Sequence, residues 1–259
     1  MQAVILCGGL GTRLREETEF RPKPMIQIGH RPILWHIMKL YSHHGVHDFI
    51  LAAGYKSEII KQYFLHYEVM DNDVTIELGR NKTIEIHHPS VEEQSWRVTI
   101  ADTGETALKG ARLKRVARHI TSDAFLVTYG DGVADVDVTK LMAFHRAHGR
   151  IATVTGIRPV SRFGELNVQG DRVAAFFEKP ASVDDFANGG FFVFQREILD
   201  YLRDEDDCDL EIGVLEKLAS AGELMVYRHN GFWACMDTQR DVDQLRRLWS
   251  SGTAPWKVW

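Results

Sequence analysis

Short apolar runs alternate with segments of helical periodicity along the first half of the chain, and this alternation is the strongest restriction on its fold. The strand-like runs span residues 3–7, 49–53, 98–101, 124–128 and 151–157. The segments with apolar residues at helical spacing span residues 32–41, 57–67, 111–119 and 138–149. Repeats of this kind predict an α/β fold with a doubly wound, mainly parallel sheet.

The second half of the chain has a different pattern, in which short strands are separated by turns. Strands are predicted at 166–168, 174–177, 191–194 and 225–229, and helices at 197–202, 211–221 and 241–250. The first three of these strands predict a small antiparallel extension of the sheet, and residues 74–78 and 83–88 predict a hairpin. Because no repeat, linker or shift in composition divides the chain, we expect a single domain over residues 1–259.

Charge and composition exclude several classes of protein. The formal net charge of -5 gives no excess of positive charge for binding nucleic acid or an anionic membrane. Apolar runs fall far short of the roughly 20 residues that a membrane span needs. The first residues read as a strand rather than a signal peptide, because no basic segment precedes them. Three cysteines without a C-x-x-C pair predict a reducing, cytoplasmic location.

A glycine-rich loop directly follows the first predicted strand. Its sequence, G-G-L-G-T-R over residues 8–13, lets the backbone approach a ligand and present N–H groups to phosphate oxygens. It is neither G-x-G-x-x-G, since Leu14 occupies the last glycine position, nor a P-loop. Taken alone, it predicts a tight strand-to-helix turn as readily as a phosphate site.

Two cations accompany this loop. Arg13 closes it, and Lys23 follows within the sequence K-P-M. An arginine can clamp two phosphate oxygens while a lysine acts as a point charge, so the pair is suited to a triphosphate.

Two aspartates follow strand-like runs. Asp131 lies in a G-D-G sequence after the strand at 124–128, where ligands bind in open α/β sheets. Asp237 follows the run F-W-A-C-M. Such a pair can hold Mg²⁺ together with phosphate oxygens. The alternatives are a plain turn at Asp131 and a helix N-cap at Asp237.

Two further motifs, E-K-P at 178–180 and N-G-G at 188–190, read by themselves as surface turns. The sequence R-F-G at 162–164 is a weaker candidate of the same kind.

These motifs, in this order and spacing, resemble the sugar nucleotidyltransferase family. The resemblance extends over nearly the whole chain and implies a Rossmann-like nucleotidyltransferase fold and a homo-oligomer. It implies a Mg²⁺-dependent enzyme that joins a nucleoside triphosphate to a sugar 1-phosphate and releases pyrophosphate. Residues up to about 135 would bind the nucleotide, and residues from about 136 to 259 the sugar phosphate.

The resemblance also implies roles for individual residues. The expected catalytic residues are Arg13, Lys23, Asp131, Lys179 and Asp237, of which Asp131 and Asp237 would bind the metal. The expected nucleotide contacts are Leu6, Cys7, Gly8, Gly9, Gly11, Thr12, Arg13, Lys23, Thr106, Ala111 and Gly130. The expected sugar-phosphate contacts are Arg162, Gly164, Glu178, Lys179, Asn188 and Gly189.

Within the family, the resemblance is closest to the cytidylyl branch, which implies CTP and α-D-glucose 1-phosphate as substrates. It is carried by residues 33–38, 113–116, 128–135, 188–193 and 254–257. Cys7 replaces the usual alanine, and we read it as a small buried thiol. Residues 206–215 also depart from the family pattern, on the sugar side.

Alternative functions remain open. The alternatives within the family are thymidylyl or uridylyl transfer, or cytidylyl transfer to another sugar phosphate. A binding regulator without catalysis is disfavoured by the complete set of charged residues.

Three other patterns predict structure rather than chemistry. The histidine pairs 43–44 and 87–88 lack further metal ligands at suitable spacing. The basic run 112–118 reads as a solvated helix face, except for Arg112, which lies near the nucleotide side. Trp249, Trp256 and Trp259 predict packing onto the domain or into a subunit interface.

Overall fold

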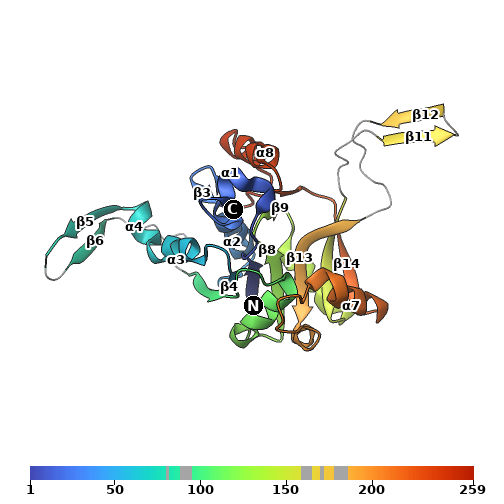
Figure 1. Ribbon diagram of the computed structural model, residues 1–259, viewed down its shortest axis with the longest axis horizontal. Helices are drawn as coiled ribbons and strands as arrows, with labels where there is room; N and C mark the ends of the chain where they lie inside the picture. Colours follow the sequence, from blue (N-terminus) through green and yellow to red (C-terminus); the bar gives the residue numbers. More distant parts are fainter. Residues whose placement is uncertain (80–81, 88–94, 159–164, 170–171, 178–185) are drawn as a thin grey trace.

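The central element of the protein is a seven-stranded sheet with helices on both faces (Figure 1). The computed structural model describes residues 1–79, 82–87, 95–158, 165–169, 172–177 and 186–259. In spatial order the strands are β14 (Leu224–His229), β10 (Ala152–Ile157), β13 (Ala187–Gln195), β8 (Ala124–Tyr129), β1 (Gln2–Leu6), β4 (Asp48–Ala53) and β7 (Arg97–Asp102). Of these seven strands, β13 runs antiparallel to its neighbours and the others are parallel. The predicted doubly wound, mainly parallel sheet is therefore confirmed.

Helices and short strand pairs surround this sheet. The α-helices are α1 (Arg15–Thr18), α2 (Ile33–His43), α3 (Ser57–Leu65), α4 (Tyr67–Asp71), α5 (Lys109–Val116), α6 (Val138–His148), α7 (Glu216–Ser220) and α8 (Gln239–Ser250). Four short segments are 3-10 helices: η1 (Thr12–Leu14), η2 (Lys23–Met25), η3 (Ala117–His119) and η4 (Arg196–Asp200). A fifth, η5 (Leu210–Leu215), is a π-helical segment. The paired short strands are β2 (Gln27–Ile28) with β3 (Arg31–Pro32), β5 (Asp73–Glu77) with β6 (Thr83–His87), β9 (Gly132–Ala134) with β15 (Trp233–Cys235), and β11 (Glu165–Gln169) with β12 (Arg172–Phe177).

Alternate side chains of each central strand enter two separate cores. In β1, Ala3 and Ile5 pack with residues of α2, α6 and α8, while Val4 and Leu6 pack with residues of α5 and α7 on the other face. Successive side chains of a strand point to opposite faces, so a strand covered on both faces must be apolar throughout. Burial of β1 on both faces explains why the run of residues at the N-terminus is continuously apolar.

Parallel pairing places the ends of β1 and β8 side by side. Leu6 is in register with Tyr129 of β8 and with Ala52 of β4. The carboxyl ends of these strands therefore meet at one edge, where the chain continues into the glycine loop after β1 and into Gly130 and Asp131 after β8.

The second half of the chain contains two differences from the predictions. The strand expected at 191–194 is part of β13 and lies inside the main sheet, between β10 and β8, rather than in an antiparallel extension. The N-G-G sequence at 188–190 is not a turn but part of the same strand, at a bulge opposite β10. Gly190 has φ +77, and a Cβ atom there would lie 2.4 Å from Cδ2 of Tyr129. A side chain at this position would collide with the tyrosine ring, so the bulge needs glycine.

The aromatic C-terminus packs onto the body of its own chain. Trp256 is 1% exposed and stacks on Phe232, with ring centroids 5.7 Å apart. Its indole N–H donates to Nδ1 of His36 at 3.4 Å, and the other ring nitrogen of His36 lies 2.9 Å from the Ile28 carbonyl oxygen. Burial lowers the pKa of His36 to about 4, so the imidazole is neutral and can accept from Trp256. Among the described helices, none is long and apolar enough to cross a membrane.

Replacing Trp256 by alanine should strongly destabilise the fold. Truncation of a buried tryptophan removes apolar contacts and leaves a cavity, which costs about 3–5 kcal/mol. Urea unfolding monitored by circular dichroism measures the change. Phe20→Ala is the control, because Phe20 is 66% exposed and its loss should change the free energy of unfolding by less than about 0.5 kcal/mol. Equal effects of the two substitutions would contradict the assigned core.

Candidate active site

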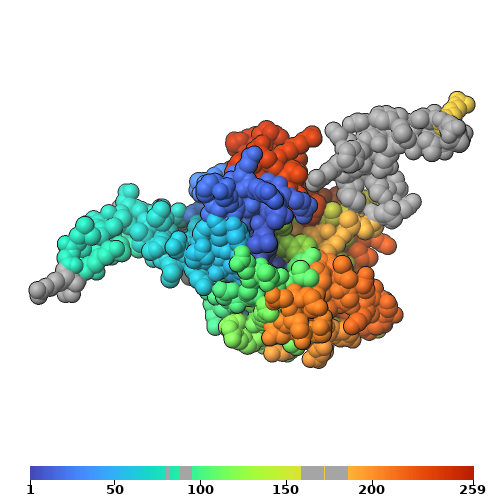
Figure 2. All heavy atoms as spheres, viewed as in Figure 1, coloured from blue at the N-terminus to red at the C-terminus, as the bar shows by residue number. Residues whose placement is uncertain are grey.

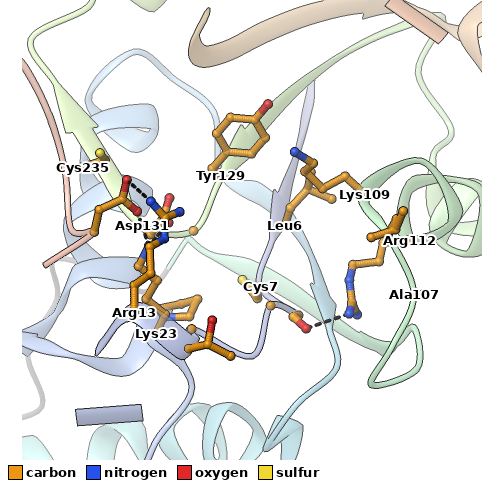
Figure 3. A pocket seen from close by; sticks show the side chains of 18 of the residues that line it. Leu6, Cys7, Arg13, Lys23, Ala107, Lys109, Arg112, Tyr129, Asp131 and Cys235 are labelled. Carbon is orange, nitrogen blue, oxygen red and sulfur yellow. Dashed lines mark hydrogen bonds and ion pairs between the residues drawn. The ribbon is translucent and has the colours of Figure 1, made fainter. Parts of the chain in front are cut away.

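A cleft of about 490 Å³ opens at the carboxyl ends of β1 and β8 (Figure 3). Six segments of the chain build it: the end of β1 with the glycine loop, the turn η2, the start of α5 with the residues before it, the end of β8, the start of β13, and β15 with the residues after it. The lining residues are Leu6, Cys7, Gly8, Gly9, Gly11, Thr12, Arg13, Lys23, Pro24, Ala107, Leu108, Lys109, Arg112, Tyr129, Gly130, Asp131, Asn188, Trp233, Cys235 and Asp237. The structure thus brings together most of the described residues that the sequence predicts for the site.

Asp131 and Asp237 meet because two short strands pair. The register of β9 and β15 places Gly132 opposite Cys235, and the Met236 amide donates to the Asp131 carbonyl oxygen at 2.9 Å. The N-cap of α8 is Thr238, so the alternative interpretation of Asp237 as an N-cap is wrong. The carboxylate of Asp237 faces the cleft instead.

The ammonium group of Lys23 lies between the two carboxylates. Its Nζ atom is 2.6 Å from Oδ2 of Asp131 and 3.0 Å from Oδ1 of Asp237. Nη1 of Arg13 lies 2.9 Å from the other oxygen of Asp237 (Figure 3). Burial disfavours the charged form of Lys23, but the attraction of both carboxylates outweighs it and raises the lysine pKa. The cleft therefore holds two carboxylates whose charges are balanced by two cations.

The buried side chain of Arg112, which is 3% exposed, holds the glycine loop in place. One guanidinium nitrogen donates to the Gly8 carbonyl oxygen at 2.6 Å and to that of Glu105 at 3.0 Å. The other donates to the Gly104 carbonyl oxygen at 2.7 Å and to the Thr103 hydroxyl at 2.8 Å. A Cβ atom on Gly8 would lie 1.9 Å from this guanidinium, so the loop can approach the arginine only with glycine there.

The hydrogen-bond partners of Arg112 in the described part of the chain are carbonyl oxygens and the Thr103 hydroxyl, and none of them is a carboxylate. Its positive charge therefore adds to the potential of the cleft wall. The basic run 112–118 is therefore only partly a solvated helix face, because Arg112 is buried. Arg112 points inward, as its predicted position near the nucleotide side suggested, whereas Arg115 pairs outward with Asp204 and Asp206.

Sequence reasoning missed Lys109 and Tyr129, which line the cleft, and Glu211, which contacts both of them. Oε1 of Glu211 accepts from the Tyr129 hydroxyl and lies 2.5 Å from Nζ of Lys109. The Asn188 amide donates to the Tyr129 hydroxyl at 3.0 Å. Burial and the nearby Glu211 raise the pKa of Tyr129, which stays protonated. Of the three missed residues, only Tyr129 carried a sequence signal, because it directly precedes Gly130 and Asp131. Glu211 lies in the segment that departs from the family pattern.

Three predicted contacts do not line the cleft. The hydroxyl of Thr106 donates to Asp206 at 2.5 Å, and Ala111 is fully buried in α5. Lys109 and Arg112 line the cleft from this segment instead. Gly189 is buried, and its carbonyl oxygen accepts from the Trp233 indole at 2.7 Å.

Four other predicted residues lie outside the described part of the chain. These are Arg162, Gly164, Glu178 and Lys179.

The remaining chemical candidates have structural surroundings. Cys7 is 1% exposed and burial raises its pKa, which confirms the interpretation as a small buried thiol. His44 lies near Thr139 and His87 near Thr75, at 3.2 Å and 2.8 Å. Within the described ranges, no three histidine, cysteine or acidic side chains form a group that could hold a metal.

Replacing Arg112 by methionine should destabilise the protein. The buried carbonyl oxygen of Gly8 and the partly buried ones of Gly104 and Glu105 would lose their donor, and one unsatisfied buried group costs about 1–3 kcal/mol. We expect a loss of at least about 3 kcal/mol in the free energy of unfolding, measured by urea denaturation. Arg118→Met, on the exposed side of the same segment, is the control and should cost less than about 0.5 kcal/mol. A neutral Arg112→Met would show that the loop does not depend on this contact.

Comparisons with known proteins find relatives of this chain over its full length. Glucose-1-phosphate cytidylyltransferase from Salmonella typhi is 51% identical over 260 aligned residues, which cover 100% of both chains. Probable glucose-1-phosphate cytidylyltransferase from Bacillus subtilis is 43% identical, again over 100% of both chains. Among solved structures, HddC from Yersinia pseudotuberculosis has a similar fold, with a TM-score of 0.69, 22% identity, and coverage of 96% of this chain and 99% of that chain.

A family model described as nucleotidyl transferase matches residues 2–250. The full-length relatives and this match confirm the resemblance seen in the sequence motifs. The chain belongs to the nucleotidyl transferase family.

Proposed function

We propose that this protein transfers the cytidylyl group of CTP to α-D-glucose 1-phosphate, giving CDP-glucose and pyrophosphate. One observation carries the proposal: Lys23, Asp131 and Asp237 converge beside the glycine loop in a single cleft. The choice of CTP and glucose 1-phosphate is supported by the names of the full-length relatives from Salmonella typhi and Bacillus subtilis.

The nucleotide would bind with its phosphates over the glycine loop. Gly8, Gly9, Gly11 and Thr12 line the cleft and can present backbone N–H groups to phosphate oxygens. The Arg13 side chain is 71% exposed, which leaves it room to turn from Asp237 toward the departing pyrophosphate. The loop and Arg13 would thus stabilise the charge that develops on the leaving group.

The two aspartates fit a Mg²⁺ ion. Their carboxylates already converge on one cation, the ammonium of Lys23, and Mg²⁺ is commonly bound by one or two carboxylates together with phosphate oxygens and water. When bound, Mg²⁺ would neutralise phosphate charge during transfer. With Asp131 and Asp237 engaged by the metal, Lys23 would be available to the triphosphate.

The sugar phosphate would attack the α-phosphorus of CTP in line, without a covalent enzyme intermediate. Positioning and charge stabilisation are then the main tasks of the protein. Asn188 lines the cleft and is the described candidate for a sugar contact. The roles of Gly189, Glu178, Lys179, Arg162 and Gly164 on this side remain predictions, as do those of Thr106 and Ala111 on the nucleotide side.

Under the same proposal, the two parts of the chain would bind different substrates. Residues up to about 135 would bind CTP and residues from about 136 to 259 the sugar phosphate, within one domain. Asp237 belongs to the second part but lies with Asp131 of the first, and the two would bind the metal together. The three free cysteines are consistent with a cytoplasmic location.

Release of pyrophosphate from a panel of nucleotides tests the proposal. Purified protein is incubated with Mg²⁺ and glucose 1-phosphate, and CTP, dTTP, UTP, ATP and GTP are offered separately. Release with CTP alone is the expected result. Release with dTTP or UTP instead would support the alternative branches. Release with none of the five, here and with other sugar 1-phosphates, would support the binding regulator.

Matched variants assign this activity to the cleft. Asp131→Asn should lower turnover by about 100-fold or more, because it removes a charge from the metal pair. Asp243→Asn, on α8 and 48% exposed, should leave turnover unchanged. Near-normal turnover of Asp131→Asn would refute its proposed role.

A further inference from the structure

A very short ribbon, β9 with β15, brings Asp131 and Asp237 together. Each strand has three residues, and the pair forms a two-stranded sheet of its own. Asp131 directly precedes β9, and Asp237 follows β15 after Met236. Two-stranded ribbons are at best marginally stable alone, and a slip of one residue turns their side chains to the opposite face. The position of the acidic pair therefore depends on what fixes this ribbon.

Helix α8 holds the chain on the C-terminal side of Asp237. Figure 2 shows this helix, in red, against the blue N-terminal part of the chain. Nε of Arg246 donates to the Gln27 carbonyl oxygen at 3.0 Å, and Nη2 lies 2.8 Å from Oε1 of Glu17. The residues after Asp237 are thus anchored, and the ribbon before it needs support of its own.

The end of the ribbon remote from the acidic pair is joined to β14 by His229, the last residue of that strand. Its Nε2 atom lies 3.1 Å from the Phe232 carbonyl oxygen and 3.0 Å from Oδ1 of Asp135. A carbonyl oxygen can only accept, so Nε2 carries the proton and donates to Phe232. The Asp135 amide donates to the same oxygen at 3.2 Å. This one oxygen therefore links β14, the turn before β15 and the residue after β9.

The contact around His229 is enclosed. The His229 side chain is 9% exposed, and Oδ1 of Asp135 is buried without a hydrogen-bond partner in the described part of the chain. A Cβ atom on Gly231 would lie 2.3 Å from that oxygen and 2.8 Å from Cε1 of His229, so the turn can close over the pair only with glycine. Removal of the imidazole would take away the polar group that the Asp135 and Phe232 oxygens share.

We propose that His229, supported by Asp135, is a positioning residue for the metal pair. It acts through the ribbon, which is about 10 Å long because a strand rises about 3.3 Å per residue. With the His229 contact in place, β15 leaves the turn in the register that brings the Met236 amide to the Asp131 carbonyl oxygen. The inference rests on the proposed metal role of Asp131 and Asp237.

Mn²⁺ binding in the presence of CTP, followed by water proton relaxation, tests the proposal. His229→Leu removes the N–H donor and should lower the Mn²⁺ affinity by about tenfold, because the two carboxylates are no longer held at one separation. His229→Gln can place an amide N–H where Nε2 lies and should restore most of the affinity. His148→Leu is the matched control, because Nε2 of His148 lies 2.7 Å from the Thr153 hydroxyl at the other end of the sheet, and it should bind Mn²⁺ like the wild type.

Hydrogen exchange of the Met236 amide gives a second readout that needs neither metal nor substrate. In His229→Leu this amide should exchange at least about tenfold faster, while the amides of β1 and β4 keep their wild-type rates. If His229→Leu does not fold, Asp135→Ala tests the same contact, since the Asp135 side chain is 32% exposed, and should change both readouts in the same direction.

The outcomes separate this inference from the function on which it rests. Wild-type Mn²⁺ affinity in a folded His229→Leu or Asp135→Ala protein, with Mn²⁺ binding lost in Asp131→Asn, would overturn the inference alone. Wild-type Mn²⁺ affinity in Asp131→Asn would overturn the metal pair and the inference together. Because Mn²⁺ binding needs no sugar phosphate, absence of cytidylyl transfer would contradict the proposed function without changing this result.

Discussion

The contact of the Lys23 ammonium with the carboxylates of Asp131 and Asp237 is the interaction on which the cleft depends. Two carboxylates brought close together repel each other unless a cation lies between them. Lys23 supplies that cation at 2.6 Å and 3.0 Å. The attraction of this shared cation holds the two carboxylates close together in the cleft.

The rest of the fold brings these three residues to one place. Parallel pairing of β1 and β8 puts the glycine loop beside Asp131, and pairing of β9 with β15 puts Asp237 beside it from a distant part of the sequence. Arg112 then ties the loop to the segment after β7. Strand pairing and the contacts of one buried arginine thus bring the parts of the site together.

The elements that could be predicted from the sequence are those with local causes. Residues 3–7 and 49–53 are apolar throughout because both faces of β1 and β4 are buried. Details that depend on distant partners could not be read this way. The sheet position of β13 is set by β8 and β10, and the N-G-G bulge by the Tyr129 ring. Lys109 lines the cleft and Ala111 does not, because the rotation of α5 is fixed by packing against Cys208, where a carbonyl oxygen accepts the Ala111 amide.

Binding of Mn²⁺ tests most directly whether Asp131 and Asp237 form the metal site. Water proton relaxation distinguishes protein-bound from nucleotide-bound Mn²⁺ and can be followed with CTP present and sugar phosphate absent. We expect one tightly bound Mn²⁺ per wild-type chain and an affinity at least about tenfold lower in Asp237→Asn. Equal Mn²⁺ affinity of the two proteins, with CTP bound equally well, would show that Asp237 is not a metal ligand.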